Sequence, residues 1–287
     1  MFNSIDRCQP LCLPFACVET DGVACPLRPE PFAHYYAEML LLLEGDMAVT
    51  VEGEEMRLSP GEAVMICPGA PHAGRVAGEG PVRFALLLAD PDQMPRAPVY
   101  APDLRTLLQA ARRAGVSMKI SREEAAELHL GEIAADCVQE CRERAFGYET
   151  EVISRLTVIF GGIIRLWFSR GLKPPERESR EDPLYTITGY IREHLRESLR
   201  VEDLAASCGL SYPWFAKKFR EIYGVSCKDY IEQVRVARVE QYLRFTQMDL
   251  TRISHQTGYA DCSHMIKNFK QIMGITPGQY RMKLKAR

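Results

Sequence analysis

Two lysines occupy matching places in two similar segments near the C-terminus. The segments "FREIYGVSCKDY" (219–230) and "FKQIMGITPGQY" (269–280) lie 50 residues apart and share Phe, Gly, an aliphatic residue, a hydroxyl residue and Tyr in the same order. Lys217 and Lys267 each precede the shared Phe by two residues. Because a Lys side chain can bind phosphate or guanine, the repeated Lys favours contact with nucleic acid. The alternative is that both lysines are only solvated.

The charge is distributed unevenly along the chain. Residues 183–287 contain 17 Lys and Arg against 10 Asp and Glu, whereas residues 1–182 contain 19 against 28. The net charge of -2 conceals this asymmetry. A basic C-terminal third on an acidic body predicts a polyanionic partner for that third only, the alternative being chance and a solvated face.

The elements around the two lysines read as helix, tight turn, helix, twice. Gly209 and Gly258 interrupt the apolar pattern, and a Gly just past a helix can take a positive φ that turns the chain. We expect Ser211 and Asp261 to cap the following helices through their side-chain oxygens. The predicted apolar faces of these helices contain Phe215, Phe219, Ile222 and Tyr223 in the first unit and Met265, Phe269, Ile272 and Met273 in the second.

This arrangement is typical of the helix-turn-helix, whose second helix lies in the DNA major groove. Between the units, residues 227–245 predict an uninterrupted helix, and about 18 residues at ~1.5 Å each span ~27 Å. Such a helix could hold two recognition helices roughly one DNA turn, ~34 Å, apart. A helical solenoid is the alternative, although two copies are too few for one.

Residues 184–283 resemble the DNA-binding domain of AraC/XylS-type transcriptional regulators. The most specific match is "GYADCSHMIKNFKQIMGITPGQYR", residues 258–281. Three positions depart from the family pattern: Ser254 and Val239 replace Ala, and Arg200 stands where a capping Ser or Thr is common. The first helix is therefore expected to begin less firmly.

The resemblance implies which side chains face DNA. In the first unit these are Tyr212, Pro213, Ala216 and Lys217, with Arg220 on the same side, and in the second they are Cys262, Ser263, His264 and Lys267, with Lys270. Pro213 and Ala216 offer no side-chain donor, so the first unit is expected to read DNA by shape, apolar contact and phosphate. Lys217 and Lys267 are the best candidates for guanine or phosphate contact.

Residues 10–100 predict a β structure, because short apolar runs alternate with Glu-Gly and Pro-Gly turns. Residues 10–90 resemble the cupin barrel that often precedes the DNA-binding part in the same family. The matching residues are His34, Glu38, Gly45, Pro60, Gly61, Pro68 and His72. Phe32 stands where metal-binding cupins have their first His, which leaves His34, Glu38 and His72 as candidates.

Three interpretations of this barrel remain. The first, which the fusion to a DNA-binding part favours, is an effector pocket formed by His34, Tyr36, Glu38 and His72, without metal, cofactor or catalysis. The second is a metal-dependent cupin enzyme, because two His and a carboxylate can form a facial triad for iron. The third is that both His are ordinary hydrogen-bonded residues of the barrel mouth.

The chain contains ten Cys, four of which cluster near the N-terminus, namely Cys8, Cys12, Cys17 and Cys25. Their spacings match no zinc pattern. The first residues lack the apolar region of a signal peptide, which predicts a reducing cytoplasm and free thiols. A thiol-based redox regulator is the remaining alternative.

The sequence therefore predicts an α+β protein with two domains. Residues 1–100 are the cupin-like effector-binding β-barrel, 101–172 a helical dimerisation or packing segment, 173–183 a linker, and 184–287 the double helix-turn-helix with its linker helix. The predicted function is that of a cytoplasmic one-component transcriptional regulator. An activator is expected, although the sequence leaves the direction of control open. Its expected partners are double-stranded promoter DNA, a small-molecule effector, a second copy in a homodimer and RNA polymerase. The sequence contains no run of ~18 uncharged apolar residues, so no membrane span is predicted.

Overall fold

A computed structural model describes the chain except residues 1–13, 22–30, 32, 96–101, 176–182 and 286–287. The chain divides into two compact units, Met1–Arg180 and Glu181–Arg287.

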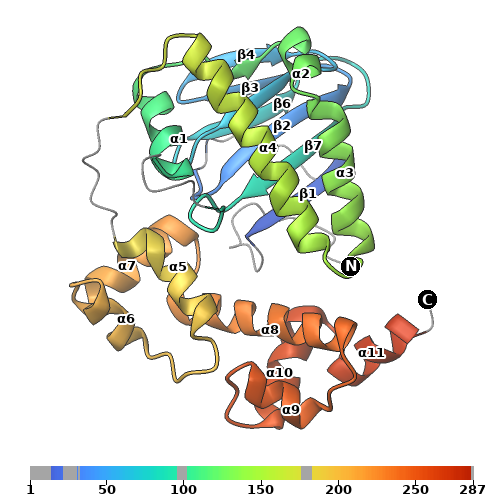
Figure 1. Cartoon of the computed structure of the whole chain (residues 1–287), viewed down its shortest axis with the longest axis vertical. Coiled ribbons are helices and arrows are strands. Elements are labelled where there is room, and N and C mark those ends of the chain that lie inside the picture. Colours follow the sequence, from blue (N-terminus) through green and yellow to red (C-terminus); the bar gives the residue numbers. More distant parts are fainter. Residues whose placement is uncertain (1–13, 22–30, 32, 96–101, 176–182, 286–287) are drawn as a thin grey trace. The chain divides into compact units, whose positions relative to one another are not determined.

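The N-terminal unit contains two antiparallel sheets (Figure 1). The larger has the strand order β1-β7-β2-β5-β8 and the smaller has the order β4-β3-β6. The strands are β1 Phe15–Asp21, β2 Ala37–Glu44, β3 Met47–Val51, β4 Glu54–Leu58, β5 Ala63–Ile66, β6 His72–Val76, β7 Arg83–Ala89 and β8 Lys119–Ile120. The predicted sheet-rich cupin region is confirmed.

The centre of the larger sheet is the apolar run of β2, "AEMLLLLE". Its first six residues are buried, because β2 pairs with β5 on one side and with β7 on the other. Gly45 then turns the chain with φ 80°, and a Cβ at this position would meet the carbonyl oxygen of Pro81 at 2.4 Å. Only Gly fits a positive φ with so close a backbone approach.

The described residues of this unit also form four helices, which are α1 Leu104–Arg113, α2 Arg122–Glu127, α3 Leu130–Glu143 and α4 Tyr148–Ser169. Helices α3 and α4 pack against each other, and α3 also packs on β1 (Figure 1). The periodicity of residues 101–172 predicted the helices but not the two-residue strand β8, which pairs with Ala63 and Val64 of β5.

Helix α4 is long and apolar enough to cross a membrane by length and composition alone, and it is the one such helix among the described residues. One face of α4 is nevertheless buried in the protein, through Val152, Leu156, Ile159, Phe160, Ile163 and Trp167. An amphipathic helix of this kind also occurs in the core of soluble proteins, so the match is weak support for a membrane span.

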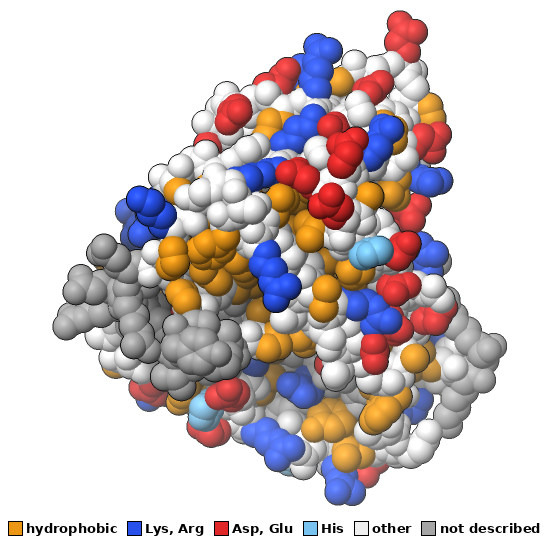
Figure 2. All heavy atoms as spheres, turned by 45° about the horizontal axis from the view of Figure 1, so that its top comes forward, with side chains coloured by type: hydrophobic (Ala, Val, Ile, Leu, Met, Phe, Trp, Pro, Cys, Tyr) orange, Lys and Arg blue, Asp and Glu red, His pale blue; other side chains and the backbone are white. Residues whose placement is uncertain are grey.

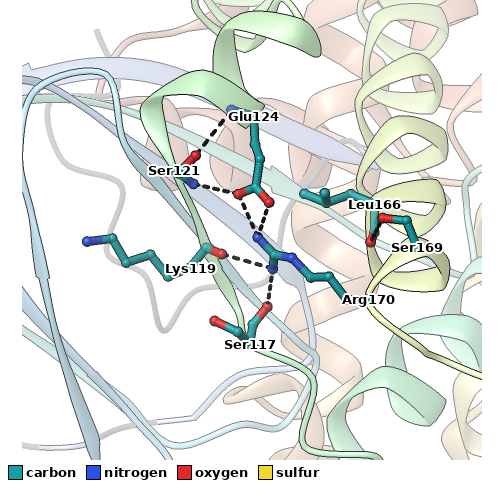
Figure 3. A network of polar contacts seen from close by, with 7 residues as sticks. All are labelled: Ser117, Lys119, Ser121, Glu124, Leu166, Ser169 and Arg170. Carbon is teal, nitrogen blue, oxygen red and sulfur yellow. Dashed lines mark hydrogen bonds and ion pairs between the residues drawn. The ribbon is translucent and has the colours of Figure 1, made fainter.

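Arg170, just past the end of α4, ties the helix to the sheet (Figure 3). Its Nη2 donates to both carboxylate oxygens of Glu124 at 2.6 Å, and its Nη1 donates to the carbonyl oxygens of Ser117 and Lys119 at 2.8 and 3.0 Å. Glu124 also completes a capping box with Ser121 at the start of α2. One guanidinium thus joins α4, α2 and β8.

The described part of the C-terminal unit is entirely helical. Its helices are α5 Pro183–Glu193, α6 Val201–Ser207, α7 Tyr212–Tyr223, α8 Cys227–Phe245, α9 Leu250–Gln256, α10 Cys262–Met273 and α11 Pro277–Lys285. Helix α8 contacts α7 on one side of the repeat and α9, α10 and α11 on the other. The continuous helix predicted between the two helix-turn-helix units, residues 227–245, is confirmed as α8.

Candidate nucleic-acid interface and buried His–Glu–His cluster

Both tight turns of the repeat contain a glycine in the left-handed region, with φ 70° at Gly209 and 78° at Gly258. The two glycines differ in their surroundings. A Cβ at Gly258 would lie 1.8 Å from the carbonyl oxygen of Leu195, whereas a Cβ at Gly209 would meet no atom within 4 Å. The second turn therefore requires Gly for both its backbone angle and its packing.

The second helices of the two helix-turn-helix units, α7 and α10, differ in the hydrogen bonds of their N-terminal caps. Asp261 caps α10 as predicted, since its side chain accepts from the His264 N–H at 2.7 Å. Ser211 occupies the cap position of α7 but makes no side-chain cap hydrogen bond, contrary to expectation. Pro213, the second helical residue, has no N–H, which removes one of the donors that a cap normally reaches. Arg200 makes no side-chain cap bond to α6, in line with the predicted weak start.

Helices α7 and α10 bury the same positions in the 50-residue register. Phe215 and Phe219 are buried in α7, as Met265 and Phe269 are in α10. The predicted DNA-facing residues all lie away from these buried positions. Those exposed are Tyr212, Pro213, Lys217, Arg220, Ser263, His264, Lys267 and Lys270, while Ala216 and Cys262 are half-buried. The structure therefore gathers each predicted set on the outer face of one helix.

The two outer faces differ in charge. On α7, Glu221 lies 2.7 Å from the Nζ of Lys218 and 3.9 Å from the Nζ of Lys217, so a carboxylate partly offsets both lysines. The sequence of α10, "CSHMIKNFKQIM", contains no acidic residue. Lys267 and Lys270 therefore present the less compensated positive charge.

Trp214 is a further exposed residue on the outer face of α7, and the sequence reasoning missed it. Its side chain is 45% exposed, and the Lys218 Nζ lies 5.8 Å from the centroid of its ring. Trp214 corresponds to His264 in the 50-residue register. Applying that register to both units would have identified Trp214, because His264 was already a candidate.

His34, Glu38 and His72 come together inside the N-terminal unit and form what we call the His–Glu–His cluster. Glu38 lies on β2 and His72 on β6, so the cluster joins the two sheets. His34 Nε2 lies 2.8 Å, and His72 Nε2 3.5 Å, from the same oxygen, Glu38 Oε2. The Tyr36 ring lies 5.7 Å from the His34 ring, so all four residues predicted to bind an effector are close together.

The hydrogen bonds around the cluster indicate the role of each ring nitrogen. His72 Nδ1 lies 2.9 Å from the carbonyl oxygen of Ala70, an acceptor, so Nδ1 carries a proton. A neutral His72 therefore presents the lone pair of Nε2 to the cluster. The second nitrogen of a metal-bound His commonly makes such a bond to a backbone carbonyl.

The donor set of the cluster is one that a divalent transition metal accepts. One ligand atom from each of His34, Glu38 and His72 lies within 4.8 Å of the others, and all three side chains are buried. Two imidazoles and one carboxylate suit iron and related metals. Phe32, which replaces the first His of metal-binding cupins, lies outside the described residues, as do Cys8, Cys12 and Cys25.

The face shown in Figure 2 is mixed in charge. Lys, Arg, Asp and Glu side chains are interspersed over its upper part, with hydrophobic side chains between them. Charges of both signs at short intervals do not create the single-sign field that attracts a polyanion.

Two known families match parts of the chain. Residues 191–283 match the family described as "Helix-turn-helix domain", and residues 26–88 match the family described as "Cupin domain". The first covers the two units built on α8, and the second covers the strands that contain the His–Glu–His cluster.

Curated relatives match through the C-terminal unit. The MmsAB operon regulatory protein of Pseudomonas aeruginosa is 30% identical over 111 residues, which is 39% of this chain and 36% of that protein. The Msm operon regulatory protein of Streptococcus mutans is 33% identical over 94 residues, which is 33% of this chain and 34% of that protein. The matching segments thus span about a third of each relative.

Solved structures give a weaker likeness. The DNA-binding domain of AdpA, solved in complex with a target DNA, is 26% identical with a TM-score of 0.37, and the match covers 37% of this chain and 96% of that one. ToxT from Vibrio cholerae is 12% identical with a TM-score of 0.42, covering 95% and 96%. Both TM-scores lie below 0.5. On its two domain matches, the chain therefore joins a cupin domain, matched over residues 26–88, to an AraC-type helix-turn-helix domain, matched over residues 191–283.

Proposed function

We propose that this protein is a one-component transcriptional regulator that binds promoter DNA through both helix-turn-helix units. The main support is the repeated outer face of α7 and α10, on which Lys217 and Lys267 occupy the same place relative to the buried Phe219 and Phe269. Both helices pack on α8, and one shared helix lets the two faces act on the same duplex.

The cupin domain is proposed to be the sensor. Its effector would contact His34, Tyr36, Glu38 and His72, whose side chains come together in the interior. A buried carboxylate between two imidazoles accepts hydrogen bonds from hydroxyl or ammonium groups, which favours a polyol or an amine. Effector binding would shift the balance between arrangements of the protein on DNA.

The proposal includes the cellular setting. A regulator of this kind works in the cytoplasm, on promoter DNA and with RNA polymerase. We also propose a homodimer, in which a second copy would double the DNA footprint and raise avidity. The exposed side chain of Val158 on α4 and the apolar length of that helix are compatible with a contact between copies.

The sensor role is tested by the thermal shift of the full chain with sugars, polyols, aromatic acids and amines, each with and without divalent metal. A metabolite that raises the melting temperature without metal, and no longer does so in the Glu38→Gln variant, supports a sensor pocket. The DNA-binding role is tested separately with residues 178–287, which are expected to bind duplex DNA at low salt. A folded fragment without affinity for DNA would remove that role.

A second candidate function, a metal-dependent cupin enzyme, rests on the donor geometry of the His–Glu–His cluster. His34, Glu38 and His72 would hold the ion, which would supply Lewis-acid or redox chemistry. His72 would be positioned by its bond to the Ala70 carbonyl. Stoichiometric iron or manganese in the purified protein, lost in the His72→Ala variant, would support this function, and a metal-free protein that responds to an effector would not.

A further inference from the structure

Three cysteine side chains from two elements meet inside the N-terminal unit, and we call them the three-thiol cluster. Cys17 lies on β1, and Cys137 and Cys141 lie one turn apart on α3, which packs on β1. Cys17 and Cys137 are buried, whereas Cys141 is partly exposed. The cluster therefore has two protected thiols and one that solvent can reach.

The two elements turn the thiols toward each other. Side chains alternate along a strand, so Cys17 shares a face with Phe15, whose ring packs edge-on against Tyr148 of α4 at 6.3 Å. That face of β1 is therefore the one covered by the helices. On α3, the buried stripe of Leu130, Ala134, Cys137 and Val138 continues to Cys141 at helical spacing.

The three thiols are neighbours. The thiols of Cys137 and Cys141 both lie close enough to the Cys17 thiol to affect its pKa. The backbone N–H of Cys17, a residue of an edge strand, also lies near the Cys141 sulfur. Arg144 lies beside Cys141, and its Nε donates to the Cys141 carbonyl oxygen at 3.2 Å.

These contacts affect the two thiols in opposite ways. The neighbouring Cys17 thiol and N–H and the Arg144 guanidinium lower the pKa of Cys141, and together they outweigh burial and the nearby Glu140. The neighbouring Cys137 and Cys141 thiols, with burial, raise the pKa of Cys17 well above its ordinary value. Cys141 is therefore the more acidic of the two thiols.

We propose that Cys141 and Cys17 are a peroxide-reactive dithiol that closes to a disulfide between α3 and β1. In the first step the Cys141 thiolate attacks one oxygen of a hydroperoxide. The S–O bond forms and the O–O bond breaks, so Cys141 becomes a sulfenic acid while the peroxide is reduced and leaves as hydroxide or alkoxide. In the second step Cys17 loses its proton and its sulfur attacks Cys141. The S–S bond forms, the S–O bond breaks, and the hydroxyl group leaves with the Cys17 proton as water.

Cys141 is the residue assigned to meet the oxidant because it is the partly exposed member of the cluster. Cys137 also touches Cys17, but it is 0% exposed. The disulfide would fix α3, and through it the α3–α4 pair, to the edge strand of the larger sheet. The reaction is independent of the proposed effector site, since it uses none of its residues.

The experiment uses the full chain with Cys8, Cys12 and Cys25 changed to Ser, so that Cys17 is the only cysteine of the N-terminal group. The protein is treated with hydrogen peroxide, alkylated and analysed by peptide mass spectrometry. We expect a Cys17–Cys141 link that dithiothreitol reverses. In the Cys17→Ser variant we expect a sulfenic acid on Cys141, trapped by dimedone. Cys137→Ser is the matched control on the same helix, and it is expected to keep the link.

A second measurement does not depend on disulfide closure. Under reducing conditions at pH 7, iodoacetamide is expected to alkylate Cys141 about tenfold faster than Cys262, which is also partly exposed. Circular dichroism of each variant checks that it is folded. The proposal is overturned by equal alkylation rates together with no Cys17–Cys141 link. A link from Cys17 to Cys137 instead would overturn the assignment of Cys141.

Discussion

His72 Nε2 lies 3.5 Å from Glu38 Oε2, although the two residues belong to different sheets and are 34 positions apart in the chain. Their contact depends on the two sheets facing each other. It places a carboxylate and an imidazole in the interior, where each needs a partner. Glu38 is therefore expected to stabilise the N-terminal unit, apart from its proposed contact with an effector.

Changing Glu38 to Gln should lower the free energy of unfolding of the N-terminal unit by about 1–3 kcal/mol, because the hydrogen bond that His34 donates to a buried carboxylate is replaced by a weaker one to a neutral amide. Urea denaturation measures this change. Glu44→Gln, at the exposed end of the same strand, is the control, and it should cost less than about 1 kcal/mol. Equal losses at the two positions would contradict the structural role of Glu38.

Changing Lys267 to Ala should weaken DNA binding and reduce the slope of log K against log salt by about one unit, because one phosphate contact is lost. Fluorescence anisotropy over a salt series measures this slope. Lys218→Ala is the control, since Lys218 is paired with Glu221 at 2.7 Å. An unchanged slope for Lys267→Ala would remove Lys267 from the DNA contacts.

Changing Gly258 to Ala should destabilise the C-terminal unit by about 3 kcal/mol or more, because the new Cβ strains the backbone and meets the Leu195 carbonyl at 1.8 Å. Gly209→Ala has nearly the same φ but open space around it, so it should cost about 1–2 kcal/mol. Thermal unfolding of the two variants compares them. Similar losses would show that the Leu195 carbonyl can move aside.

Changing Arg170 to Gln should lower the stability of the N-terminal unit by about 1–3 kcal/mol, because the Glu124 carboxylate and two backbone carbonyls lose their donor. Arg155→Gln, within α4 and paired with the exposed Glu151, should cost less than about 1 kcal/mol. Denaturant titration distinguishes the two. A larger loss for Arg155→Gln would place the stabilising contact elsewhere on α4.

The same contact predicts a dependence on acid. Burial raises the pKa of Glu124, but hydrogen bonds from the Ser121 N–H and the Arg170 guanidinium outweigh it and hold the pKa below its ordinary value. A lowered pKa in the folded state contributes stability that is present above the unfolded value of about 4.3 and is lost as pH falls through the folded value. The difference in stability between wild type and Glu124→Gln should therefore shrink below about pH 4.

The repeat, its helices and most of its outer face could be predicted from local sequence. Gly209 and Gly258 mark the turns, and the spacing of Phe215, Phe219 and their counterparts marks the buried sides, because helical periodicity is a property of neighbouring residues. The cap bond expected of Ser211 is absent, and the neighbouring residues do not account for this. The third helical residue, Trp214, has an N–H, and the Asp261 cap of α10 bonds to the N–H at the equivalent position, His264.

Contacts between distant residues were decided only by the tertiary structure. The sequence by itself identified His34, Glu38 and His72 through a family resemblance. The distances among them depend on how the sheet that contains β2 is placed against the sheet that contains β6. The strand β8 forms because Lys119 and Ile120 pair with β5, and two residues are too few to predict a strand from the sequence. Cys17, Cys137 and Cys141 show the same limit most clearly. No local pattern connects a strand with a helix 120 residues later, and only the packing of α3 on β1 brings their sulfur atoms together.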